Sequence, residues 1–243
     1  FWDTSTSANG AHNLTVIARD AAGNVATSAS VLLTILNNSA TVRQLTPADS
    51  WCGVINSAAP GTTIVLGPGS YPDSCHIMAS GTASAPITIR SQGPSTAVRA
   101  NLNYNGTVSN TIDLSGSFIA IRWLILGPSQ DGIDGIRIRS SHDNLIEENL
   151  FQNIGGVGVP NNDNGTSARI TVRSNTFAGS KSTVIYMGCH DGIACHATQI
   201  LIEGNLITGG ALPGDGVGSG VQIKLNSSAI VRDNTIYGTT GAG

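Results

Sequence analysis

The stretch Leu145-Ile146-Glu147-Glu148-Asn149-Leu150-Phe151 is the first of four similar segments, each built around one asparagine. The other three are Thr171-Val172-Arg173-Ser174-Asn175-Thr176-Phe177, Leu201-Ile202-Glu203-Gly204-Asn205-Leu206-Ile207 and Ile230-Val231-Arg232-Asp233-Asn234-Thr235-Ile236. Successive asparagines are 26, 30 and 29 residues apart, and Ile or Val precedes each of them by three positions. A strand-sized unit repeated at this period predicts a solenoid.

Each segment has the pattern of a strand followed by a turn. Apolar and polar residues alternate before the asparagine, and the asparagine marks a turn because its side chain tolerates unusual backbone angles. A helix is disfavoured because the runs are short, rich in β-branched residues and ended by Gly or Asn. Stacked coils would bring equivalent residues to about 4.8 Å. We therefore expect Asn149, Asn175, Asn205 and Asn234 to form a ladder of amide hydrogen bonds.

A column of charged residues accompanies the asparagines, two positions before each of them. A fifth, degenerate unit at residues 119–126 aligns on Ile121 and places Leu124 in the asparagine column. The charged column then reads Arg122, Glu147, Arg173, Glu203 and Arg232. Opposite charges would thus be neighbours, and each exposed pair contributes only about 0.2–1 kcal/mol. We expect the column to fix the register of the coils rather than to act as a catalytic stripe.

A second strand column lies upstream in each coil, at residues 135–139, 156–159, 184–188 and 220–224. The residues expected to point inward are Ile136, Ile138, Val157, Val159, Ile185, Met187, Val221 and Ile223. Those expected to point outward are Arg137, Arg139, Tyr186, Gln222 and Lys224. With this pattern the chain resembles the right-handed parallel β-helix proteins, a broad family that includes pectate lyases, other polysaccharide lyases and polygalacturonases. The resemblance covers roughly residues 43–243 and implies an all-β, right-handed parallel β-helix.

The region before the repeats predicts a cap for the solenoid. Residues 41–60 read as a linker and a capping helix over residues 46–58, with Thr46 as N-cap and Pro47 at the first helical position. Such a helix would cover the first coil. We expect further strands at residues 63–66, 75–78, 87–91 and 111–114. The β-helix would occupy residues 61–243, with an open or truncated coil at its C-terminal end.

Residues 1–40 follow a different pattern. Strands are expected at residues 14–18 and 31–36, joined by Arg19-Asp20-Ala21-Ala22-Gly23-Asn24. This stretch resembles the last strands of a bacterial immunoglobulin-like module, which needs about seven strands to bury a core. Two interpretations remain open: a fragment of such a module, or a segment completed by strands from a partner.

Composition limits the classes of partner and the compartment. Charged residues make up 11% of the 243-residue chain and the net charge is −3, which disfavours nucleic-acid binding and polybasic membrane binding. No apolar run is long enough to insert into a membrane. The four cysteines predict two disulfides, Cys52–Cys75 and Cys189–Cys195. They favour an extracellular or cell-surface setting, and the modules look bacterial.

The loop Cys189–His196 concentrates reactive residue types. Its spacing lacks the paired Cys-x2-Cys of common zinc sites, so a disulfide-closed loop is favoured and no metal ligand is assigned. The resemblance to lyases implies a Lys or Arg base at an outward strand position, and a cation or Ca²⁺ that neutralises a substrate carboxylate. The candidates for catalysis are Lys224, Arg137 and Arg139, and those for substrate binding are Tyr186, Gln222 and His190. Asp131, Asp134, Asp191 and Asp215 could bind Ca²⁺; no other cofactor is expected.

Two functions from different classes remain in competition. The first is a secreted β-helix that engages extracellular polysaccharide, in a lyase-like or hydrolase-like reaction. The second is a non-catalytic structural or adhesive subunit of an extracellular filament or cell-surface assembly, with neighbouring copies of the chain as partners. The polygalacturonase pattern is absent and no complete lyase signature is present. Trp123 could stack against a sugar, although nothing in the sequence supports that role.

Overall fold

The computed structural model describes residues 10–35, 41–163, 165–189, 195–210 and 218–241. The chain separates into two compact units, Phe1–Thr41 and Val42–Gly243. The range predicted as linker and capping helix, residues 41–60, also contains the first strand of the second unit, β5 (Val42–Leu45).

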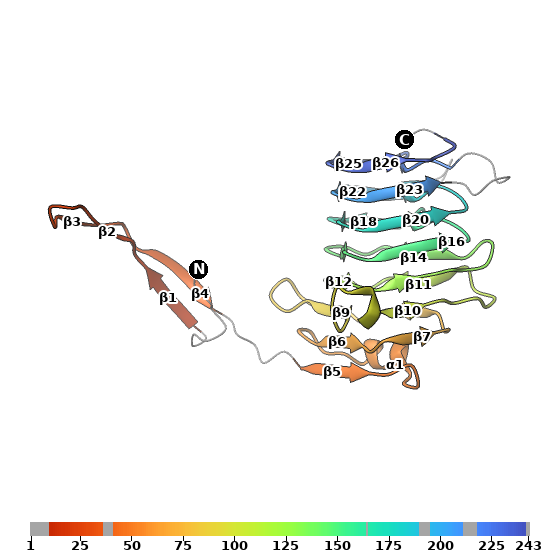
Figure 1. Ribbon diagram of the computed structural model, residues 1–243, viewed down its shortest axis with the longest axis horizontal. Coiled ribbons are helices and arrows are strands. Elements are labelled where there is room, and N and C mark those ends of the chain that lie inside the picture. Colours follow the sequence, from red (N-terminus) through yellow and green to blue (C-terminus); the bar gives the residue numbers. More distant parts are fainter. Residues whose placement is uncertain (1–9, 36–40, 164, 190–194, 211–217, 242–243) are drawn as a thin grey trace. The chain divides into compact units, whose positions relative to one another are not determined.

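The second unit is a solenoid whose coils carry strands on three faces (Figure 1). The first face stacks β5, β6 (Thr63–Leu66), β9 (Ile87–Ser91), β12 (Ile119–Arg122), β15 (Leu145–Glu147), β19 (Thr171–Arg173), β22 (His196–Glu203) and β25 (Ser227–Arg232), with β18 (Thr166–Ala168) also paired to β22. The second face stacks β7 (Gly69–Tyr71), β10 (Ala100–Leu102), β13 (Ile125–Leu126), β16 (Leu150–Ile154), β20 (Thr176–Ser180), β23 (Leu206–Gly210) and β26 (Thr235–Tyr237). All pairings within these faces are parallel, so the predicted all-β parallel solenoid is confirmed.

The third face consists of two three-stranded sheets. One contains β8 (Cys75–Ile77), β11 (Asn110–Leu114) and β14 (Asp134–Ile138), and the other β17 (Val159–Asn161), β21 (Ile185–Met187) and β24 (Val221–Ile223). Backbone hydrogen bonds join them, since the N–H of Gly135 donates to Val157 at 2.9 Å and that of Ile136 to Gly158 at 3.0 Å. This face contains the second strand column expected from the sequence.

The amide ladder expected from the sequence is present. Nδ2 of Asn149 donates to Oδ1 of Asn175 at 3.1 Å, and the next two steps measure 3.1 and 2.9 Å, ending at Asn234. Leu124 occupies the same column, and its backbone N–H donates to Oδ1 of Asn149 at 3.0 Å. Each side chain thus also binds the backbone of the preceding coil, which fixes the turn between the first and second faces.

The charged column lies beside this ladder. Arg122 and Arg173 both form ion pairs with Glu147, the latter at 2.7 Å, and Arg232 pairs with Glu203 at 2.7 Å. The column also continues one coil further than the sequence alignment proposed. Arg90 in β9 stands beside Arg122, so two like charges are neighbours at that end.

The predicted capping helix is shorter than expected. Helix α1 spans Trp51–Asn56 and lies at the β5 end of the stack, with Trp51 and Ile55 buried (Figure 1). Thr46 does not cap it, because the backbone N–H and hydroxyl of Thr46 both donate to the carboxylate of Asp49, at 2.7 and 2.8 Å. These two bonds close a separate turn before the helix begins.

One inward position on the third face was predicted wrongly. Val157 precedes β17 and is half-buried, because that strand begins only at Val159. Ile223 keeps the inward register of the buried Met187 and is 39% exposed because it belongs to the last described coil. In the coils below, Ile136 and Ile185 are fully buried, as expected.

The first unit contains two antiparallel strand pairs. Strand β1 (Gly10–Leu14) pairs with β4 (Val31–Ile35), and β2 (Ile17–Arg19) with β3 (Val25–Thr27). Residues 1–9 and 36–40 lie outside the described part. An immunoglobulin-like module therefore stays a prediction. Within the described residues of both units, no helix has the length and apolarity needed to cross a membrane.

Both predicted disulfides are confirmed. Cys52 and Cys75 link α1 to β8 with their Cα atoms 5.2 Å apart, and Cys189 and Cys195 are linked at a Cα separation of 5.6 Å. Two disulfides are consistent with an extracellular protein.

Candidate functional site

A groove of about 370 Å³ lies on the third face and brings together three of the residues singled out from the sequence. Its lining consists of Val157, Asn162, Ser182, Thr183, Tyr186, Gln222 and Lys224. Tyr186 and Gln222 are direct neighbours in the register of β21 and β24. Because successive side chains of a strand alternate between its faces, both point away from the core.

Lys224 and Tyr186 lie close together in the groove. The Lys224 ammonium nitrogen lies 5.7 Å from the centroid of the Tyr186 ring, which is a cation–π distance. The backbone N–H of Lys224 donates to the carbonyl of Met187 at 2.8 Å, so its main chain is held by β21. Within the part of the chain that the structure describes, no carboxylate forms an ion pair with Lys224. The main chain of Lys224 is thus fixed by β21, and its side-chain amine lines an open groove.

The other two candidate bases are in ion pairs instead. Nε of Arg139 donates to Asp113 at 2.5 Å, and Nη1 of Arg137 to Asp134 at 3.3 Å. Arg137 also donates to Oδ1 of Asn162 at 2.6 Å, which places it behind a side chain of the groove. Neither arginine lines the groove. Of the three cations named from the sequence, Lys224 is therefore the strongest candidate for a base.

The carboxylate behind the groove is Asp134. Burial raises its pKa, whereas the N–H of Val157, which donates to Oδ1 at 2.7 Å, and the neighbouring Arg137 act in the opposite direction. The carboxylate thereby ties the start of β14 to the turn before β17. This contact orders the backbone at one edge of the groove.

Polar side chains suited to sugar hydroxyls complete the lining. Nε2 of Gln222 donates to the hydroxyl of Ser219 at 3.1 Å, which leaves its amide oxygen at the groove. Thr183 lies in the turn before β21, and Asn162 directly follows β17. Neither residue was predicted from the sequence, because these turns differ from coil to coil and show no repeat.

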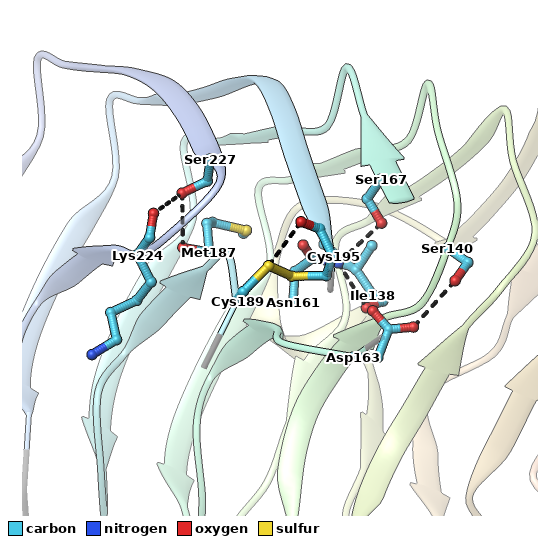
Figure 2. The surroundings of a disulfide bond; sticks show 10 residues. All are labelled: Ile138, Ser140, Asn161, Asp163, Ser167, Met187, Cys189, Cys195, Lys224 and Ser227. Carbon is cyan, nitrogen blue, oxygen red and sulfur yellow. Dashed lines mark hydrogen bonds between the residues drawn. A yellow bond between two sulfur atoms is a disulfide. The ribbon is translucent and has the colours of Figure 1, made fainter. Parts of the chain in front are cut away.

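The disulfide Cys189–Cys195 supports the backbone beside Lys224 (Figure 2). The N–H of Cys189 donates to the carbonyl of Leu225 at 3.1 Å, one residue after Lys224. The Lys224 carbonyl accepts a hydrogen bond from the hydroxyl of Ser227, and Figure 2 shows the side chain of Lys224 extending away from the sulfur atoms. Cys189 thus holds the main chain next to Lys224, whose side chain lines the groove.

The expected Ca²⁺ ligands do not come together in the described residues. Asp131 pairs with Lys181, and Asp134 with Arg137. Asp191, Asp215 and the candidate substrate ligand His190 lie outside the described part. Within that part, no group of three or more His, Cys, Asp or Glu could hold a metal ion. Calcium binding stays a prediction.

Comparison with known proteins agrees with the architecture. Residues 135–243 match the family model described as right handed beta helix region. The crystal structure of an alginate lyase from Paenibacillus sp. superposes with a TM-score of 0.70 and 23% identity, covering 84% of this chain and 68% of that one.

Two further structures are more distant, and no curated protein sequence matches the chain. A mannuronic acid specific polysaccharide family 6 lyase from human gut microbiota has a TM-score of 0.36 and 12% identity, covering 78% of this chain and 58% of its own. A lacto-N-biosidase from Eubacterium ramulus has a TM-score of 0.38 and 10% identity, covering 83% and 57%. The coils, the match of residues 135–243 and the TM-score of 0.70 together identify the fold as a right-handed parallel β-helix.

Proposed function

We propose that the chain is an extracellular lyase for uronate-containing polysaccharide and that the third-face groove is its reaction site. One observation carries the proposal: the Lys224 amine lies 5.7 Å from the Tyr186 ring, in an open groove of about 370 Å³. The similarity to an alginate lyase supports the class of polymer, since alginate is built from uronates.

The proposed reaction is a β-elimination at a uronate linked through C4. The Lys224 side chain, in its deprotonated amine form, accepts the proton on C5, beside the carboxylate, and becomes an ammonium. The electrons of that C–H bond form the C4–C5 double bond, and the bond from C4 to the bridging oxygen breaks. The Tyr186 phenol protonates the departing oxygen. Proton exchange with water then restores the amine and the phenol.

The remaining groups of the groove would position the sugar. Gln222 and Thr183 offer an amide and a hydroxyl to the sugar hydroxyls. Asn162 lies between the groove and Arg137, whose charge would help to stabilise the substrate carboxylate as negative charge develops next to it. Groups fixed before the reaction supply this stabilisation without reorganising.

Purified protein should be incubated with polymannuronate, polyguluronate and polygalacturonate, and the ultraviolet absorbance of the unsaturated product followed. We expect one of these polymers to be cleaved by the wild type, and cleavage to fall by at least about a hundredfold in Lys224→Ala. Absence of unsaturated product from every polymer would contradict the proposal. Equal rates for the wild type and a folded Lys224→Ala protein would contradict the assignment of the base.

A structural or adhesive subunit is the second candidate. The observation in its favour is the composition, with only 11% charged and 5% aromatic residues. Neutral polar side chains can pack against one another in an assembly without charge repulsion. Under this alternative, sedimentation would show end-to-end assembly of copies, and the groove variants would change nothing.

A further inference from the structure

Trp123 occupies a turn position at which the other coils carry small or polar residues. The residue before the ladder has a φ of 60° at Trp123, and the equivalents Glu148, Ser174, Gly204 and Asp233 have φ between 53 and 62°. Left-handed backbone is a genuine outlier for a bulky side chain. The turn itself recurs in every coil and belongs to the fold, whereas the tryptophan at this position is particular to one coil.

Two arginines gather at the Trp123 ring. The guanidinium carbon of Arg90 lies 5.4 Å from the ring centroid, and that of Arg122 lies 5.9 Å from it. The two residues are direct register neighbours, and like charges placed opposite each other are destabilising. Elsewhere the column alternates Arg with Glu. Within the described residues, Arg90 has no ion pair and donates instead to the carbonyls of Ser91 and Gln92, at 2.9 and 3.3 Å.

Two glutamates accompany the ring and its arginines. Nε1 of Trp123 donates to the carboxylate of Glu148, and Arg122 forms an ion pair with Glu147. Among the described residues, Arg90 is therefore the guanidinium at the ring that has no carboxylate partner. Such a guanidinium can bind a carboxylate supplied by a ligand.

We propose that Arg90, Arg122 and Trp123 form a second, non-catalytic site that binds the carboxylates of an acidic polysaccharide. Guanidinium groups bind carboxylates in a bidentate manner, and the aromatic ring holds both of them in place. The site lies at the turn between β12 and β13, and none of its residues lines the third-face groove. It would therefore retain the polymer while another part is cleaved, which raises the local substrate concentration. Only the choice of ligand rests on the proposed function.

The test measures retention of the protein in gels that contain polymannuronate, polyguluronate or polygalacturonate, with neutral dextran as the reference polymer. All variants carry Lys224→Ala so that no polymer is cleaved. We expect retention by the acidic polymers alone, weakened about tenfold by Arg90→Gln, the loss expected for one charge-assisted hydrogen bond. Arg43→Gln is the matched control, because it removes the same charge from an exposed position in β5 and should leave retention unchanged.

Arg90→Lys separates the contribution of geometry from that of charge. It keeps the charge but loses the planar fork, so we expect retention between that of the parent and that of Arg90→Gln. Since Arg90→Gln removes a like-charge neighbour, we expect it to fold as the parent does, which circular dichroism checks. Equal retention of Arg90→Gln and Arg43→Gln would overturn the proposal, as would equal retention by dextran. If the wild type cleaves none of the polymers, only the lyase assignment fails. Retention in the gels is measured without catalysis and tests the binding site separately.

Discussion

The buried asparagines show at the residue scale how the coils are held in register. Oδ1 of Asn175 accepts from both Nδ2 and the backbone N–H of Asn149, while its Nδ2 donates to Ile146 and Asn205. Asn149, Asn175 and Asn205 are each only 1% exposed. Because an unmade hydrogen bond inside a protein costs more than the net gain of a made one, this ladder strongly disfavours slippage of one coil.

Replacing one asparagine of the ladder should therefore destabilise the fold strongly. Asn175→Ala leaves two donors of Asn149 without an acceptor, so we expect the free energy of unfolding to fall by about 2–4 kcal/mol. Urea denaturation measures this change. Asn105→Ala is the control, because Asn105 is exposed and its amide binds only the carbonyl of Asn103. Similar losses in the two variants would contradict the structural role of the ladder.

The lowered pKa of one surface carboxylate, Asp143, makes part of the protein's stability depend on pH. Hydrogen bonds from Arg169, aided by His142, hold the pKa of Asp143 below the usual aspartate value of 3.8. A lowered folded-state pKa means that the ion pair stabilises the fold above the unfolded-state pKa, and that this contribution is lost as the pH falls through the folded-state value.

Asp143→Asn tests this contribution. We expect the difference in unfolding free energy between wild type and variant to be largest near neutral pH and to shrink as the pH falls below the usual aspartate pKa of 3.8. Denaturation at several pH values measures it. A difference independent of pH would show that the charge of Asp143 does not contribute.

The sequence predicts the repeated elements well and the irregular ones poorly. Strands of the first face recur with an asparagine, so their bounds and register could be read directly. Arg90 was not included in this alignment, because no asparagine follows the strand at residues 87–91. Thr46 was mistaken for a helix cap, because a turn closed by Asp49 shows the same residue pattern as a capped helix. Asn162 and Thr183 lie where coils differ in length, so no periodicity marked them.

The two disulfides differ in what they connect, which gives a matched comparison at the element scale. Cys189 and Cys195 are 6 residues apart and support the main chain beside Lys224, whereas Cys52 and Cys75 are 23 apart and attach the capping helix. Loop entropy predicts losses of about 2 and about 3 kcal/mol on removing them. Of the two disulfides, Cys189–Cys195 is the one whose backbone contacts the chain beside the groove.

We expect the Cys189→Ser/Cys195→Ser protein to lose catalytic efficiency even at temperatures where it is fully folded. The Cys52→Ser/Cys75→Ser protein should be less stable but keep the wild-type kcat/KM while folded. Thermal unfolding and polymer cleavage, measured on the same samples, check both statements. Equal kcat/KM in the two variants would show that the Cys189–Cys195 disulfide does not position Lys224.

For the whole molecule, charged residues gather at three places on the solenoid. The Arg–Glu pairs of the first face neutralise one another, the groove keeps one lysine amine near a phenol, and the turn at Trp123 gathers arginines. The fold class followed from periodicity, because a repeat constrains every coil at once. The groove could not be predicted from periodicity. It depends on which outward residues form ion pairs, and only the three-dimensional structure shows that.

The most direct test of the central claim is the polymer cleavage rate of Tyr186→Phe beside that of Tyr237→Phe. Both changes remove one phenolic hydroxyl, but Tyr186 lines the groove while Tyr237 is exposed on β26. If the Tyr186 phenol protonates the departing oxygen, kcat/KM should fall by at least about a hundredfold in Tyr186→Phe and stay unchanged in Tyr237→Phe. A folded Tyr186→Phe protein with wild-type kcat/KM would contradict the account.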